Sequence, residues 1–201
     1  MHTSTSCLRL ALVLACSLWC SPLLGQWIVA AEVGSDRFWG GSVDKTDEQR
    51  AFLPYRPTTF GVGLARGVGR FAIGMRLRYA SASLALEGAE GVVAVKGILT
   101  MYSLSPELVY RIATVGSVHP LLLHAGPIFE VWSAIDEDPE ARLGVQGALS
   151  LKVPLGGRFA GSVMVGAAVI PSPFGADQLV PDFERRALWR RRFAGGLEYR
   201  L

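Results

Sequence analysis

Cysteine is scarce in this chain, and the few cysteines lie together. The 201-residue sequence has three, Cys7, Cys16 and Cys20, all close to the N-terminus. The rest of the chain has no thiol. A disulfide framework and thiol chemistry are therefore excluded for that part of the protein.

Long apolar runs are also missing beyond the N-terminal segment. A membrane-spanning helix needs about 20 consecutive apolar residues, and no segment after residue 31 offers them. If this part of the chain crosses a bilayer, we expect it to do so as a closed barrel. Open sheet edges would leave unpaired backbone groups in hydrocarbon.

Neither an excess of charge nor a cluster of histidines is present. Lys and Arg number 20 against 17 Asp and Glu, which gives no reason to expect a nucleic-acid partner. Beyond the N-terminal segment the histidines are His119 and His124, whose odd spacing puts them on opposite faces of one strand. We expect no metal site and no cofactor.

The N-terminus has the features of a secretory signal peptide. Arg9 supplies positive charge, an apolar run extends to Leu24, and the small residues Ala30 and Ala31 close the segment. We predict a signal peptide over 1–31 and one domain over 32–201. A cut after Gly25 also fits the pattern. A retained anchor is the alternative, although polar residues and a proline interrupt the run.

The rest of the chain alternates between apolar and small or charged side chains. The clearest example is the segment 70–85, where Phe71, Ile73, Met75, Leu77 and Tyr79 interleave with Ala72, Gly74, Arg76 and Arg78. The segment 141–155 behaves in the same way. Period two places each set on one face of a pleated strand.

Turn signals divide this region into eight predicted strands. They cover residues 33–43, 57–66, 70–85, 95–113, 118–135, 141–155, 158–170 and 188–201. Tight turns at 67–69, 116–117 and 156–157 alternate with longer connections at 44–56, 86–94, 136–140 and 171–187. Short turns on one side and longer loops on the other are typical of up-and-down antiparallel transmembrane β-barrels.

The final strand carries a more specific pattern. Gly196, Tyr199 and Leu201 are spaced as in the C-terminal assembly signal of bacterial outer-membrane barrels, although the last residue is not aromatic. The region as a whole resembles the small, eight-stranded outer-membrane β-barrel proteins. That resemblance implies insertion into the outer membrane of a Gram-negative-type envelope, contact with its lipid, and recognition of the last strand by the barrel-assembly machinery. It brings no enzymatic motif.

Charged residues group with the small face of the strands, which would line the lumen. An eight-stranded interior is only wide enough to be filled by side chains. We therefore predict an ion-pair network that plugs it, formed by Arg76, Arg78, Arg111, Glu130, Arg142, Lys152, Arg158, Glu198 and Arg200. Because these residues are mostly basic, a conducting pore, the alternative, would favour anions.

An arginine cluster lies at the predicted outer end of the last strand. Arg190, Arg191 and Arg192, with Arg185 and Arg186 nearby, suggest contact with lipopolysaccharide phosphates, since guanidinium groups bind such oxygens bidentately. A solvated rim balanced by the acidic 136–140 loop is the alternative interpretation.

The sequence thus favours a non-enzymatic, integral outer-membrane barrel with a structural, adhesive or weakly pore-forming, porin-like role. One alternative is a soluble, lipocalin-like exported barrel, which would need an apolar interior. The other is an outer-membrane lipid-modifying hydrolase. That enzyme would need His124 beside Ser103, Ser105 or Ser150 and a carboxylate, on the lipid-facing or rim surface.

Overall fold

The chain forms one closed antiparallel barrel of eight strands. The computed structural model describes residues 26–45, 51–88, 91–116, 118–134, 138–172 and 183–201. Its strands are β1 (Gln26–Asp44), β2 (Ala51–Val68), β3 (Phe71–Gly88), β4 (Gly91–Val115), β5 (His119–Ala134), β6 (Glu140–Gly156), β7 (Phe159–Ile170) and β8 (Phe183–Arg200). Each strand pairs with the next, and β8 returns to pair with β1. The predicted all-β, up-and-down architecture is confirmed.

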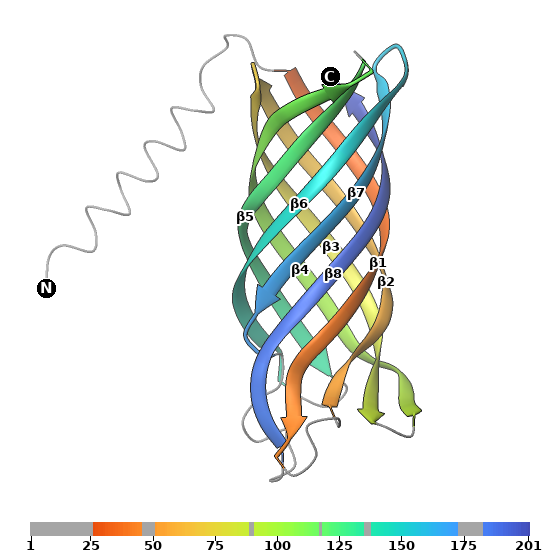
Figure 1. Ribbon diagram of the computed structural model, residues 1–201, viewed down its shortest axis with the longest axis vertical. Coiled ribbons are helices and arrows are strands. Elements are labelled where there is room, and N and C mark those ends of the chain that lie inside the picture. The colour runs from red at the N-terminus through yellow and green to blue at the C-terminus, as the bar shows by residue number, and fades with distance from the viewer. Residues whose placement is uncertain (1–25, 46–50, 89–90, 117, 135–137, 173–182) are drawn as a thin grey trace, which may run out of the picture.

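Tight turns and chain ends share one end of the barrel. The β2–β3 and β6–β7 turns lie there together with the start of β1 and the end of β8 (Figure 1). Gly69, Gly116 and Gly157 adopt positive φ in the β2–β3, β4–β5 and β6–β7 turns, a conformation that glycine permits at little cost. We call this the turn end and the opposite one the loop end.

Several strands are longer than the sequence pattern predicts. The β3–β4 ladder continues to the pair Gly88 and Gly91, so most of the connection expected at 86–94 is strand. β8 likewise begins at Phe183 rather than at 188. Backbone pairing continues past the point where the side-chain alternation fades, because ladder hydrogen bonds do not depend on an apolar face.

β1 begins before the predicted domain boundary at residue 32. Gln26 pairs with Gly67 of β2, and Ile28 pairs with Arg200 of β8. Val29 is 43% exposed and faces outward, on the same side of the sheet as Val33. A barrel that started at Glu32 would lack residues 26–31 and would leave the ends of β2 and β8 without a partner. The small pair Ala30–Ala31 is part of a strand.

We therefore propose that the signal peptide is cut after Gly25. The purified mature protein is expected to begin at Gln26, because this cut keeps β1 complete. Intact-mass measurement and N-terminal sequencing of protein from the outer-membrane fraction check this. A mature chain that begins at Glu32 would contradict the proposal.

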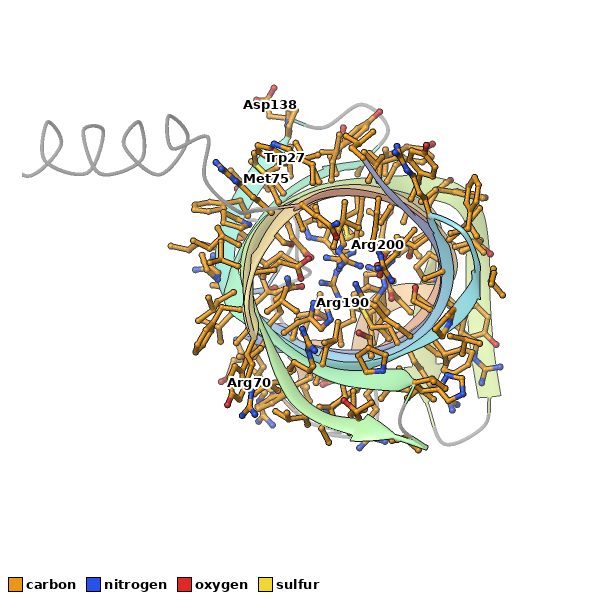
Figure 2. All side chains as sticks on the ribbon, turned by 90° about the horizontal axis from the view of Figure 1, so that it is seen from above. Trp27, Arg70, Met75, Asp138, Arg190 and Arg200 are labelled. Atoms are coloured by element: carbon orange, nitrogen blue, oxygen red, sulfur yellow. The ribbon has the colours of Figure 1, made fainter. Side chains whose placement is uncertain are left out.

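The outer surface of the barrel is apolar. Val33, Phe60, Ile73, Leu143 and Phe193 are each half exposed or more. Arg190 lies within the ring of strands (Figure 2), and Arg76, Arg78 and Glu130 are buried as well. A soluble carrier needs the opposite arrangement, with an apolar interior and a polar exterior. The exterior suits lipid as its solvent.

Aromatic side chains form pairs on this surface. Phe71 contacts Tyr110, and Phe159 contacts Tyr199, in the turn-end half of the barrel. Trp39 stacks on Trp189 towards the loop end, with ring centroids 6.3 Å apart. Trp132, by contrast, lies inside the barrel and is 3% exposed.

Candidate functional site: the lumen and the loop-end surface

One carboxylate links three arginines at the centre of the lumen. Glu32 of β1 forms an ion pair with Arg76, and its Oε1 lies 2.9 Å from Nε of Arg78 and 3.0 Å from a terminal nitrogen of Arg192. These side chains come from β1, β3 and β8 and are all at least nine-tenths buried. They meet because each occupies an inward position of its strand.

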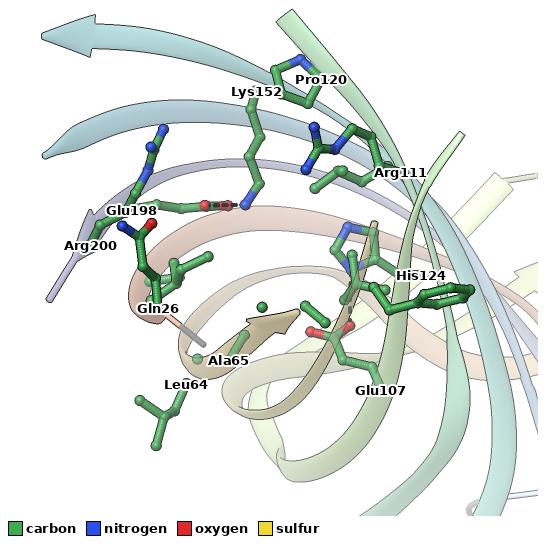
Figure 3. A pocket seen from close by; sticks show the side chains of 18 of the residues that line it. Gln26, Leu64, Ala65, Glu107, Arg111, Pro120, His124, Lys152, Glu198 and Arg200 are labelled. Atoms are coloured by element: carbon green, nitrogen blue, oxygen red, sulfur yellow. Dashed lines mark hydrogen bonds and ion pairs between the residues drawn. The ribbon is translucent and has the colours of Figure 1, made fainter. Parts of the chain in front are cut away.

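A second row of polar side chains extends from Arg76 across four neighbouring strands. Arg76 donates two hydrogen bonds to Glu107 Oε1, of 3.0 and 2.8 Å. The other Glu107 oxygen lies 3.3 Å from His124 Nδ1, and His124 Nε2 lies 2.8 Å from Ser150 Oγ. Figure 3 shows His124 above Glu107. The row joins the Glu32 cluster through Arg76.

Close approach between β4 and β5 helps to place Glu107. Pro106 has no backbone N–H to donate to the ladder. A Cβ atom on Gly126 of β5 would lie 2.1 Å from the Pro106 carbonyl oxygen. Only glycine therefore fits opposite this proline, and Glu107 follows it on the lumen face, 7% exposed.

The order Ser150, His124 and Glu107 is that of a nucleophile, a base and an orienting carboxylate. The hydrolase alternative required this group on the lipid-facing or rim surface, and the structure places it inside the lumen. Ser150 is 2% exposed and does not line the neighbouring cavity. Ser105 bonds to Arg78 instead of His124. The group as arranged links β4, β5 and β6 inside the lumen.

The loop-end half of the lumen is largely apolar. Phe38, Leu53, Met101, Trp132 and Leu188, with Ala80, form a buried cluster. Arg190 and Glu130 are embedded beside it, with a 2.5 Å ion pair, and Trp132 donates a 2.9 Å hydrogen bond to the other Glu130 oxygen. The ion-pair network that the sequence predicted therefore fills only part of the lumen.

Buried charge in the lumen is balanced. The arginines Arg76, Arg78, Arg190 and Arg192 face the carboxylates Glu32, Asp36, Glu107 and Glu130. Sequence reasoning missed Glu32, Asp36 and Glu107. Glu32 and Asp36 follow the inward period of β1. Glu32 lies just before the predicted start of this strand at residue 33, whereas Asp36 lies within the predicted segment. The basic excess that underlay the expected anion preference is absent from this region.

The predicted network is only partly assembled. Arg76, Arg78 and Glu130 belong to the central clusters, Lys152 pairs with Glu198 nearer the turn end, and Arg142 pairs with Glu140 at 2.7 Å near the loop end. Arg111, Arg158 and Arg200 are exposed around the turn end. Arg111 donates a hydrogen bond to the Gly69 carbonyl oxygen.

A cavity of about 700 Å³ occupies the turn-end half of the lumen. Its lining includes the buried Arg76, Glu107 and His124 and the exposed Arg111 and Arg200; Figure 3 shows the last four of these side chains. No residue of the loop-end apolar cluster lines it. The cavity is therefore a vestibule that ends at the ionic network.

The arginine cluster of β8 is divided between two faces. Arg190 and Arg192 are 2% and 7% exposed and point into the barrel, so their predicted contact with lipopolysaccharide is wrong. Arg191 alone faces outward, with its guanidinium carbon 4.9 Å from the centre of the Trp39 ring. Side chains alternate along a strand, so three consecutive arginines cannot share one surface.

Within the described residues, no cluster of three or more potential metal ligands occurs. No helix in the described part of the chain is long and apolar enough to span a membrane.

Comparison with known proteins shows a shared fold without recognisable sequence similarity. No protein-family model matches the chain, and no curated protein sequence does either. The crystal structure of Neisserial surface protein A matches with a TM-score of 0.58 and 7% identity, over 86% of this chain and 96% of that one. The outer membrane protein OprG from Pseudomonas aeruginosa matches with a TM-score of 0.51 and 14% identity, over 89% and 96%.

Fold and exterior together define the class of this protein. It has the closed, eight-stranded β-barrel fold of small outer-membrane proteins, with an apolar outer surface and a lumen closed by side chains at its centre. Such an outer surface suits a lipid surrounding.

Proposed function

We propose that this protein is a non-enzymatic, non-conducting outer-membrane barrel with a structural or adhesive role. The observation that carries the proposal is the occluded lumen. Glu32 is paired with three arginines across the barrel, and the Arg190–Glu130 pair and the apolar cluster lie beyond it. A function as a general pore would need this central part of the lumen to be open.

Pairing makes this plug costly to displace. Removing one partner of a buried ion pair typically costs about 3–5 kcal/mol, because the remaining charge is left unpaired in a low-dielectric interior. Inward side chains of three strands form the Glu32 cluster. Opening a path through the lumen therefore means breaking several ion pairs at once. The functional surfaces of a plugged barrel are then its exterior and its ends.

Planar-bilayer recordings test the closed lumen. The wild-type protein is expected to show no stable single-channel conductance. A Glu32→Ala/Arg78→Ala/Arg192→Ala variant removes three central side chains but leaves the Arg190–Glu130 pair and the apolar cluster in place, so we expect no stable conductance from it either. Heat-dependent mobility on SDS gels checks that both proteins are folded. Reproducible channels in the wild type, with either ion preference, would contradict the proposal.

Outer-membrane lipid is the proposed partner of the exterior, and lipopolysaccharide the proposed partner near the loop end. The lipid-facing apolar surface supports the first. For the second, Arg191 is the member of the predicted arginine cluster that lies on the outer face, and it is exposed beside Trp39. Binding of lipid A by a variant that lacks Arg191 and the arginines beside it tests this contact.

A further inference from the structure

A basic hollow lies in the barrel wall where β1 and β2 separate, with exposed arginines around buried Phe38, Leu53 and Pro54. Their pairing ends at Ser35 and Thr58, while β1 continues alongside β8. The hollow has a volume of about 380 Å³ and is lined by Arg37, Phe38, Trp39, Leu53, Pro54, Tyr55, Arg56 and Arg191. Three of these residues are arginines and none is acidic.

Two of the arginines stand directly opposite each other. Arg37 of β1 is the register partner of Arg191 of β8, and both side chains are exposed on the outer face. Like charges placed opposite each other on one face of a sheet destabilise it. No ion pair to either side chain is found among the described residues. Arg191 instead packs over the Trp39 ring, which leaves its charge intact.

The third arginine is brought there by an unusual backbone. Arg56 is the one non-glycine residue in the described chain with positive φ, at 38°. It lies in a bulge of β2, where the register to β3 shifts between Tyr55 and Thr58. Left-handed conformations of such residues cost about 1–3 kcal/mol and cluster at functional sites. Here the bulge aims Arg56 at the hollow, beside the Tyr55 ring.

The hollow lies at the height of lipid headgroups. Along β1, the outward residues between Trp27 and Arg37 are small or apolar, and the two ends of this segment are separated by about ten residues, the length that spans the bilayer. Trp39 and Trp189 stack just beyond Arg37, as expected for aromatic residues at a membrane interface. Cations at this level meet the phosphate layer of the outer leaflet.

From this geometry we propose that Arg37, Arg56 and Arg191 form a binding site for a phosphate group of lipopolysaccharide. The inference rests on the proposed outer-membrane role and names the residues of its lipid contact. The lipid A phosphate would neutralise the Arg37–Arg191 repulsion and accept charge-assisted hydrogen bonds from guanidinium groups on three strands. The Trp39 and Tyr55 rings would pack against the adjoining sugar.

Titration with lipid A, followed by native mass spectrometry, tests the site. The Arg37→Gln/Arg56→Gln/Arg191→Gln variant is expected to bind lipid A at least about 10-fold more weakly than the wild type, since each lost contact is charge-assisted. The matched control, Arg70→Gln/Arg158→Gln/Arg200→Gln, removes the same charge from exposed positions at the turn end. We expect less than about a 2-fold change for the control.

Lipid A stripped of its phosphates completes the design. It is expected to bind the wild type and both variants alike. The proposal is overturned if the loop-end variant binds phosphorylated lipid A as the wild type does, or if both variants weaken equally. It is also overturned if the loss is the same for stripped lipid A. Folding is checked by heat-dependent gel mobility. The lipid A measurements can disprove the phosphate site alone. If they do, and the wild-type protein shows no conductance, the proposed function stands.

Discussion

Replacing Glu32 with alanine is expected to lower the free energy of unfolding by about 3–5 kcal/mol. Glu32 accepts contacts from Arg76, Arg78 and Arg192, and its side chain is 6% exposed. Without it, Arg76 keeps Glu107 as a partner, but Arg78 loses its ion pair. Arg192 would retain only the Asp36 carboxylate, 3.9 Å away. Denaturant unfolding in lipid vesicles measures the change.

A second carboxylate provides the matched control for Glu32. Glu140 also pairs with an arginine, Arg142, but its side chain is 34% exposed, near the loop end. Exposed pairs contribute about 0–1 kcal/mol, so Glu140→Ala is expected to have little effect. Glu32→Gln, which retains an acceptor oxygen but no charge, should fall between the two. Equal losses for Glu32→Ala and Glu140→Ala would show that the Glu32 cluster is hydrated and weak.

Breaking the Arg190–Glu130 pair is expected to have an effect of similar size. Both side chains are at most 2% exposed and sit beside the apolar cluster. Arg190→Met alone leaves a carboxylate without its cation, and Glu130→Gln alone leaves a guanidinium without its anion. Each is expected to lower the free energy of unfolding by about 3–5 kcal/mol.

The double variant Arg190→Met/Glu130→Gln should recover most of this loss. It removes both charges together, and glutamine retains an oxygen to accept the Trp132 indole N–H, now 2.9 Å from Glu130. Buried pairs replaced as a unit by neutral side chains are often close to neutral in stability. We expect a coupling free energy of at least about 2 kcal/mol from the double-mutant cycle. Additive single effects would contradict a direct, desolvated pair.

The sequence could predict much of the fold but less of the site. The alternation in 70–85 and 141–155 identified the outward and inward faces correctly, as the exposure of Ile73 and Leu143 shows. It did not locate the start of β1, because small residues at Ala30 and Ala31 suit both a cleavage site and a strand. Glu32, which links the lumen network, lies just before the predicted start of the strand at residue 33.

The arginine cluster shows the same division. Residues 190–192 are adjacent in sequence and suggest one basic patch, but adjacent residues of a strand lie on opposite faces. The outward partner of Arg191 is Arg37, which is paired with it only because β8 closes the barrel against β1. Arg56 joins them through a bulge that no local pattern indicated.

By itself the sequence determined that eight segments of strand length alternate between apolar and polar side chains. It also determined which side chains of a segment share a face. These features are local, since the pleat of a strand alternates side chains whatever its neighbours are. Only the tertiary structure decided which charges meet. Glu32 and Arg76 are 44 positions apart. Their contact depends on closure and on the stagger of the strands, which no single segment of sequence encodes.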